Sequence, residues 1–143
     1  MNVYADTSFL VSLYTTDANT AEAEKHFATH PRLWLSPLHR AELTHAISQR
    51  VFRRHISAHE AQQVFKQFEQ DRTSRLWEEV DMPDGVFDAC IRLARKQAAK
   101  LGVRTLDTLH VASALKLGAQ EFWTFDGRQS KLARAEGLKL MKP

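Results

Sequence analysis

Short apolar runs alternate with helical segments along this chain, and that alternation constrains its fold more than any other feature. Strands that alternate with helices predict a parallel sheet whose connecting helices cover both of its faces. We therefore expect an α/β fold, a three-layer sandwich with a central, mostly parallel sheet of four or five strands flanked by helices. The predicted strands cover residues 2–5, 33–35, 76–80, 121–125 and 138–140, and the predicted helices cover 7–14, 20–29, 37–53, 57–72, 83–101, 105–118 and 127–136.

The bulk composition fits one domain spanning residues 1–143, with no low-complexity tract to divide it. A net charge of +3 and a pI near 9.2 are compatible with a nucleic-acid partner but do not identify one. Cys90 is the one cysteine, and its apolar helical surroundings favour a core role. No signal peptide is evident, nor an apolar run of roughly 20 residues, so we expect a cytoplasmic protein without a membrane partner.

Four acidic residues stand where separate segments place their polar ends: Asp6, Glu42, Asp107 and Asp126. Asp6 and Asp126 each close an apolar run that is predicted to be a strand, and ligands of parallel sheets bind beyond the carboxyl ends of the strands. Glu42 and Asp107 lie on the more apolar sides of helices, where a carboxylate needs a partner. Acids gathered from distant segments suggest a shared hard divalent cation. This interpretation predicts a metal-dependent enzyme that acts on phosphodiesters.

Three of these acids also have a structural interpretation. Asp6 precedes a helix and is a natural N-cap, a task that is compatible with metal binding. Asp107 lies in the first turn of a helix, where a negative charge suits the helix dipole. Asp126 belongs to a Phe-Asp-Gly sequence that is a frequent turn signal at the end of a strand.

The remaining polar candidates lie beside these acids. Glu42 borders an apolar stripe, so its structural alternative is a salt bridge at the rim with Arg40 or His39. His110 lies one turn beyond Asp107 on the same helix face, which favours a hydrogen-bonded inner histidine over a metal ligand. Thr124 shares strand parity with Asp126 and is therefore expected to orient it or to hold a metal-bound water.

Together, four pieces of the chain resemble the PIN-domain nucleases, and more narrowly the VapC-type toxins of bacterial toxin–antitoxin pairs. The pieces are VYADTSFLVSLY, the Ser-Pro helix that carries Glu42, RTLDTLHVASAL and FWTFDGRQ, and the resemblance covers nearly the whole chain. It implies a PIN-like sandwich. It also implies that the four acids bind Mg²⁺, with Mn²⁺ as a substitute, and that the protein cleaves RNA as an endoribonuclease. Thr7, Ser8 and Thr124 match polar positions around the family's site, whereas TFDGRQ has one acid where some relatives have two.

The resemblance and the chemistry of the acids together give an expected mechanism. We expect Asp6, Asp107 and Asp126 to hold the metal, and Glu42 to act through water or to orient the attacking water. A metal-bound water would attack the phosphodiester in line, so no side-chain nucleophile is required. Mutual repulsion in the empty site is expected to raise the pKa of one carboxylate.

The expected partners are the RNA substrate and a small antitoxin protein, in a homodimer or a toxin–antitoxin hetero-oligomer. Two basic clusters are candidates for phosphate contacts, although a solvated surface explains either of them. An apolar stripe on the fourth helix and the end of the helix before it are candidates for an antitoxin groove. The basic clusters are Arg92, Lys96 and Lys100, and Arg50, Arg53 and Arg54; the groove candidates are Ala61, Val64, Phe65 and Phe68 with Val51 and Phe52.

Other functions are compatible with parts of this pattern. A haloacid-dehalogenase-like phosphatase also begins with an Asp at a strand end, but its pattern has a second Asp where Ser8 stands here. A receiver domain has paired acids near its first strand, and this chain has one. A catalytically inert protein- or RNA-interaction module on the same fold would use the acids only as caps and in salt bridges.

Overall fold

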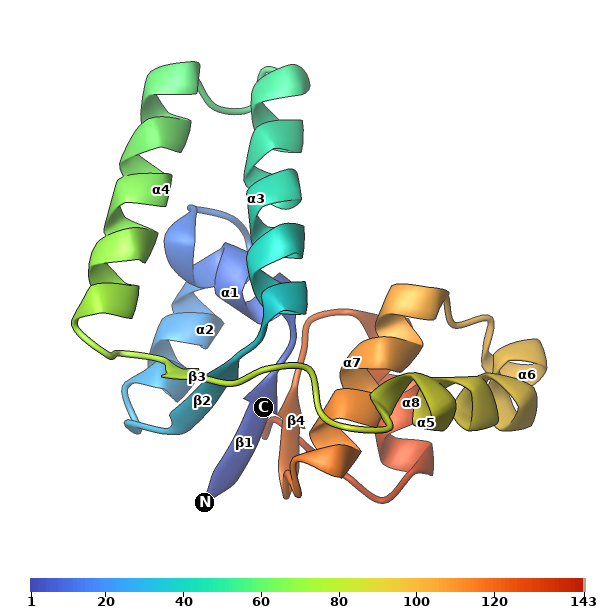
Figure 1. Ribbon diagram of the computed structural model, residues 1–143. Helices are drawn as coiled ribbons and strands as arrows, with labels where there is room; N and C mark the ends of the chain where they lie inside the picture. The colour runs from blue at the N-terminus through green and yellow to red at the C-terminus, as the bar shows by residue number, and fades with distance from the viewer. Residues whose placement is uncertain (143) are drawn as a thin grey trace.

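The computed structural model describes residues 1–142 as a five-stranded sheet covered by helices on both faces (Figure 1). The strand order is β3-β2-β1-β4-β5, and each of the four pairings is parallel. The predicted α/β sandwich is therefore confirmed. The strands are β1 (Asn2–Ala5), β2 (Arg32–Leu35), β3 (Glu78–Glu79), β4 (Glu121–Trp123) and β5 (Lys139–Leu140).

The helices fall into two groups along the chain. The first group covers one face of the sheet, and α3 and α4 extend beyond it as a long antiparallel pair (Figure 1). The second group covers the opposite face. The first group is α1 (Thr7–Tyr14), α2 (Thr20–Phe27), α3 (Pro37–Phe52) and α4 (Ala58–Thr73); the second is α5 (Val86–Leu93), the π-helical turn η1 (Ala94–Ala98), α6 (Ala99–Leu101), α7 (Thr105–Lys116) and α8 (Gly127–Ala135).

The central strands supply two separate cores because alternate side chains point to opposite faces of a sheet. In β1, Val3 and Ala5 pack with the first group of helices, whereas Tyr4 packs with the second. In β4, Trp123 joins the first core and Phe122 the second. Both faces of these strands are buried, as is typical of parallel sheets. Cys90 lies in the second core, as its apolar surroundings predicted.

The element boundaries differ from the prediction in two instructive places. The strand predicted over residues 76–80 is reduced to Glu78–Glu79, because the Trp77 side chain packs into the first core and its indole nitrogen donates to Tyr14 Oη at 3.0 Å. The helix predicted from Pro83 begins at Val86, because Gly85 has a left-handed φ of 73° that breaks helical geometry. No helix within residues 1–142 has the length and apolar character needed to cross a membrane.

His39 fixes the start of α3 on the end of β1. It is fully buried, and its Nε2 donates to the Ala5 carbonyl at 2.8 Å, while its Nδ1 accepts from the Ser36 backbone N–H at 3.0 Å. These bonds require a neutral ring. Burial, with the charge of nearby His110, lowers the pKa of His39 from 6.5 to about 3.

A histidine held neutral by the fold makes stability depend on pH. Because its pKa is lower in the folded state, the unfolded chain takes up the proton first, so His39's contribution is complete above pH 6.5 and is lost as the pH falls toward 3. We predict that the free energy of unfolding of the parent protein falls more steeply between pH 6.5 and 5 than that of His39→Gln, by up to about 1.4 kcal/mol per pH unit. Urea denaturation at several pH values measures both slopes. The exposed His59→Gln on α4 is the control, and parallel profiles for the parent and His39→Gln would contradict the prediction.

Candidate functional site

Asp6 occupies the centre of the candidate site because two parallel strands end side by side. The backbone N–H of Asp6, directly after β1, donates to the Trp123 carbonyl of β4 at 3.0 Å. Its side chain is fully buried and accepts from the Ser8 hydroxyl at 2.6 Å and from the Phe9 backbone N–H at 3.2 Å. Thr124 donates to its other oxygen. Asp6 is thus the N-cap of α1, and its carboxylate is held in one orientation.

The Asp6 carboxylate is buried without a Lys or Arg beside it in the described residues 1–142. Burial raises the pKa of Asp6, and His110 together with the hydrogen bonds from Ser8, Thr124 and Phe9 only partly offsets this. Within residues 1–142, no Lys or Arg nitrogen lies within 4.0 Å of this carboxylate. A hydrogen-bonded but uncompensated carboxylate of this kind is a suitable ligand for a cation.

Asp126 lies three residues beyond Trp123, the last residue of β4. Its side chain caps α8 by accepting from the backbone N–H groups of Arg128 at 2.8 Å and Gln129 at 3.1 Å. Its own backbone N–H donates to the Thr124 hydroxyl at 2.9 Å, and that hydroxyl in turn donates to Asp6. Thr124 therefore bonds to the carboxylate of Asp6 and to the backbone of Asp126, whereas the sequence predicted that it orients Asp126 or holds a metal-bound water.

Ser8 joins the same two segments from the other side. Its hydroxyl donates to Asp6 and accepts from the Phe125 backbone N–H at 3.0 Å, which fastens the loop after β4 onto the first turn of α1. Ser8 is thus a hydrogen-bonding partner of the first acid.

Asp107 is buried in the first turn of α7, as its apolar helix predicted. One carboxylate oxygen accepts from the Arg104 backbone N–H at 3.0 Å and lies 3.4 Å from Arg104 Nε. The other oxygen accepts from Gln129 Nε2 at 3.3 Å. Arg104, before α7, and Gln129, at the start of α8, thus both hold the Asp107 carboxylate in place.

Glu42 is half-buried on α3 and belongs to a second group of polar residues. Its carboxylate accepts from the Thr7 hydroxyl at 2.7 Å and from His110 Nε2, and the Tyr4 hydroxyl and His110 Nδ1 share a hydrogen bond of 2.7 Å. The alternative of a rim salt bridge with Arg40 or His39 is wrong, because His110 is the partner. His110 is buried and hydrogen-bonded, as the sequence favoured, but its partners are Glu42, Tyr4 and Thr7 and not Asp107 on its own helix.

The surroundings of Glu42 and Asp6 shift the pKa values of the two carboxyl groups in opposite directions. Partial burial opposes the charge on Glu42, but the hydrogen bond and charge of His110, with further help from Thr7 and Arg104, outweigh it and lower the pKa of Glu42. Burial instead dominates at Asp6 and raises its pKa. Asp6 is therefore the carboxylate with a raised pKa. The leading cause is desolvation, whereas the sequence predicted repulsion between the acids.

Hydrogen bonds connect three of the four acids through Thr124 and Gln129. The fourth acid, Glu42, accepts a hydrogen bond from Thr7, the residue after Asp6. Within residues 1–142, no three His, Cys, Asp or Glu side chains converge closely enough to form a ready-made metal cluster. The donors of the site are nonetheless carboxylate oxygens, the type that Mg²⁺ and Mn²⁺ prefer, and Asp6 has no cationic partner. The chemistry of these residues therefore fits a hard divalent cation.

Sequence reasoning missed two residues of this site, Gln129 and Tyr4. Gln129 follows Asp126 by three positions, a capping-box spacing that would have marked the start of α8. Nothing in the sequence pointed to Tyr4, since a tyrosine inside a short strand is ordinarily a core residue.

Arg104 is the one Lys or Arg within residues 1–142 that forms an ion pair with one of the four acids. Its side chain is 70% exposed although its Nε lies beside Asp107. Within residues 1–142, its two terminal nitrogens make no hydrogen bond. Of the predicted basic clusters, Lys96 pairs with Glu136 and Arg50 pairs with Asp17.

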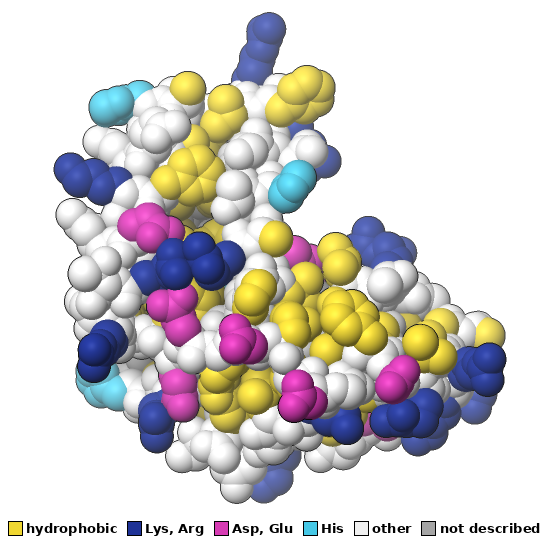
Figure 2. Space-filling model, viewed as in Figure 1, with side chains coloured by type: hydrophobic (Ala, Val, Ile, Leu, Met, Phe, Trp, Pro, Cys, Tyr) yellow, Lys and Arg dark blue, Asp and Glu magenta, His cyan; other side chains and the backbone are white. Residues whose placement is uncertain are grey.

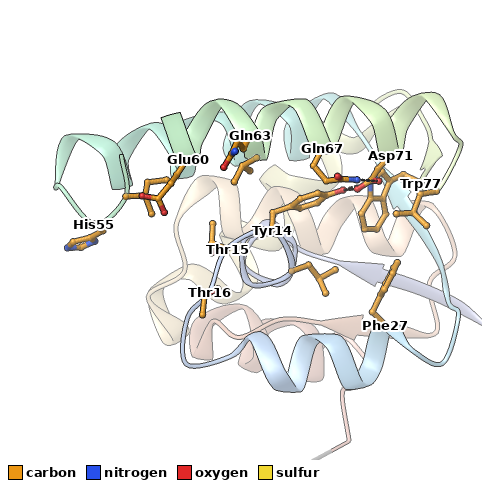
Figure 3. Close-up of a pocket in the computed structure, with 14 residues that line it drawn as sticks. Tyr14, Thr15, Thr16, Phe27, His55, Glu60, Gln63, Gln67, Asp71 and Trp77 are labelled. Carbon is orange, nitrogen blue, oxygen red and sulfur yellow. Dashed lines mark hydrogen bonds between the residues drawn. The ribbon is translucent and has the colours of Figure 1, made fainter. Parts of the chain in front are cut away.

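A groove of about 650 Å³ lies between α4 and the segment formed by α1 and α2, and none of the four acids lines it (Figure 3). Val64, from the apolar stripe of α4, lines this groove, whereas Phe65 lines a different pocket beside α3. Ala61 and Phe68 are buried in the first core, so most of the stripe predicted as an antitoxin groove packs α4 onto the protein itself. Figure 2 shows further hydrophobic side chains at the tip of the α3–α4 pair.

Acidic residues gathered over the carboxyl ends of a parallel sheet define a class of α/β proteins with a ligand site at that edge. The family model described as PIN domain matches residues 3–135, so the chain belongs to the PIN-domain family. Because the chain has this family's fold and motifs, the haloacid-dehalogenase-like alternative is set aside.

Solved structures share the fold at low sequence identity. VapC20 of Mycobacterium tuberculosis, described as a sarcin–ricin loop cleaving toxin, has a TM-score of 0.75 at 20% identity and covers 99% of both chains. VapBC2 of Rickettsia felis, bound to a promoter DNA fragment, has a TM-score of 0.67 at 17% identity, with 99% of this chain and 98% of the other covered. FitAcB of Neisseria gonorrhoeae has a TM-score of 0.73 at 14% identity, with 98% and 96% covered. No protein with a curated function matches the sequence.

The contrasting surroundings of Asp6 and Asp107 predict opposite effects of the same substitution. In a chelator, Asp6→Asn should melt at or above the temperature of the parent protein, because it removes a charge that burial disfavours and keeps a residue that caps α1. Asp107→Asn should cost about 1 kcal/mol, because it removes the ion pair with Arg104 and places an amide opposite Gln129. Thermal unfolding of both variants in EDTA measures this, and a strongly destabilised Asp6→Asn would contradict it.

Proposed function

We propose that this protein is a metal-dependent endoribonuclease and the toxin of a type II toxin–antitoxin pair. The observation that carries the proposal is the fully buried Asp6 carboxylate, which has no cationic partner within residues 1–142 and is hydrogen-bonded through Thr124 to the segment of Asp126. Membership of the PIN-domain family and a fold shared with a toxin described as cleaving the sarcin–ricin loop support the activity and the substrate. We further propose that residues 1–143 act as one cytoplasmic domain.

The proposed cation is Mg²⁺, with Mn²⁺ as a substitute, held by Asp6, Asp107 and Asp126, with Glu42 binding through water. Bound there, the cation would neutralise charge on the phosphoryl oxygens and activate water for attack on phosphorus. Hydrolysis on this plan needs no side-chain nucleophile.

The protein's own residues divide the remaining tasks. Thr124 and Ser8 hold the Asp6 carboxylate in one orientation, so little reorganisation is needed when a ligand binds. His110 and Thr7 keep Glu42 ionised and directed, which suits a base or an orienting group for water. The exposed guanidinium of Arg104 lies at the edge of the site, where it can contact an RNA phosphate.

The proposed activity predicts cleavage of RNA that depends on a divalent cation. The purified protein should cut RNA with Mg²⁺ or Mn²⁺ and stop in EDTA, and Asp6→Asn should lower the rate at least about 100-fold because the site loses a ligand charge. Gel or fluorescence assays of a labelled RNA measure the rate. Glu60→Gln, which removes an exposed acid from α4, is the matched control and should cut as the parent does. Undiminished cleavage in EDTA, or by Asp6→Asn, would rule out the proposed site.

The proposed protein partner is an antitoxin that binds the groove between α4, α1 and α2. One of the similar structures is described as a toxin–antitoxin complex, from Klebsiella pneumoniae. The groove presents apolar side chains from several elements beside Glu60 and polar residues of α4 (Figure 3). That combination suits an amphipathic helix. A homodimer, or a hetero-oligomer with the antitoxin, is the proposed assembly.

The groove predicts which exposed apolar residue the antitoxin contacts. Leu76 is 45% exposed and lines the groove, so Leu76→Glu should weaken binding of the antitoxin encoded beside this protein by about 10-fold or more while the fold is kept. Phe52→Glu is the matched control, because Phe52 is 84% exposed and does not line the groove. Calorimetry measures both affinities, and growth rescue on co-expression measures the effect in cells. Parental affinity in a folded Leu76→Glu protein would exclude this groove.

A further inference from the structure

Gln129 is the residue that links Asp107 to Asp126. It lies on the first turn of α8 with 7% of its surface exposed. Its backbone N–H donates to Asp126 Oδ1 at 3.1 Å, and its side-chain Nε2 donates to Asp107 Oδ1 at 3.3 Å. One residue thus binds two acids that are 19 positions apart in the chain, one on α7 and one at the end of β4.

The side-chain carbonyl oxygen of Gln129, Oε1, makes no hydrogen bond within residues 1–142. Among the buried side-chain nitrogens and oxygens of these residues, it is the only one without such a bond. A buried carbonyl oxygen left in this state costs free energy, so such an atom calls for an explanation. The explanation must supply a hydrogen-bond donor beside Asp107.

Rotation of the amide does not remove the problem. With nitrogen and oxygen exchanged, Oε1 would face the Asp107 oxygen, and an ionised carboxylate can only accept hydrogen bonds. The bond to Asp107 would be lost, and Nε2 would then lack an acceptor. The orientation in which Nε2 donates to Asp107 and Oε1 stays free is therefore the favoured one.

We propose that Gln129 is a positioning residue of the cation site, which holds Asp107 and Asp126 at a fixed separation and offers Oε1 to a water molecule carried by the divalent cation. The inference rests on the proposed function, because it assumes that Asp107 and Asp126 hold the cation. Residues that orient metal ligands in this way commonly change metal affinity 10–100-fold when they are replaced. A neutral amide suits the task because it donates to one acid and accepts from a water, whereas a carboxylate there would repel both acids.

Replacing the amide with an apolar chain of similar length tests the proposal. Gln129→Met should raise the Mg²⁺ and Mn²⁺ concentrations for half-maximal thermal stabilisation by about 10-fold or more, measured without RNA. In EDTA its melting temperature should stay close to that of the parent protein, since the substitution also removes an unpartnered buried oxygen. Gln129→Asn, which keeps the amide but cannot reach as far, should shift the cation response in the same direction and serves if the Met variant does not fold.

The matched control is Gln97→Met. Gln97 lies in η1 and contacts the C-terminal end of α8, whereas Gln129 lies at its start. Gln97 is also a part-buried glutamine whose Nε2 donates to a carboxylate, that of Glu136, at 3.0 Å. This variant should keep the parental cation response, which separates loss of any glutamine–carboxylate bond from loss of the one at the site.

The outcomes separate the inference from the proposed function. Parental cation midpoints in folded Gln129→Met and Gln129→Asn overturn the inference, even if the parent protein cleaves RNA. A parent protein that binds the cation, loses affinity on Gln129→Met and yet cuts no RNA overturns the proposed ribonuclease while the inference stands. A parent protein whose stability does not respond to either cation overturns both.

Discussion

The parallel pairing of β1 with β4 is the constraint on which the candidate site depends. It places the residue after Ala5 beside the residue after Trp123, so that Asp6 and Thr124 meet at the same edge of the sheet. Side chains alternate across both strands and pack on two faces, so a slip by one residue would move each side chain into the opposite core. The position of the first acid follows from this packing, because Asp6 directly follows a strand that is buried on both faces.

Around that edge, the surroundings give the acids different chemical characters. Asp6 is fully buried and receives only neutral hydrogen-bond donors, whereas Glu42 is half-buried and receives His110. One carboxylate is therefore destabilised in its charged form and the other is stabilised. Paired acids separated in this way suit a division of labour in which one binds a cation and the other handles a proton or a water.

The acids and the large groove occupy different parts of the molecule. Hydrogen bonds through Thr124 and Gln129 link Asp6, Asp107 and Asp126, whereas the groove lies between α4 and the segment of α1 and α2 and is lined by none of the four acids. A partner seated in the groove would bind α1 directly, and α1 begins at the Asp6 cap and carries Thr7 and Ser8. This short helix is thus the physical link between a partner surface and the candidate site.

The sequence alone predicted the order of elements and the parallel sheet, and it named four candidate acids, because apolar periodicity and strand ends are local properties. It also predicted that Asp107 and His110 are buried, since their helix is apolar on nearly every side. Only the tertiary structure decided that His110 serves Glu42, that Gln129 joins Asp107 to Asp126, and that the α4 stripe is mostly core. Each of these depends on contacts between segments far apart in the chain, such as the 68 positions between Glu42 and His110, and local patterns carry no information about which distant side chain completes a hydrogen bond.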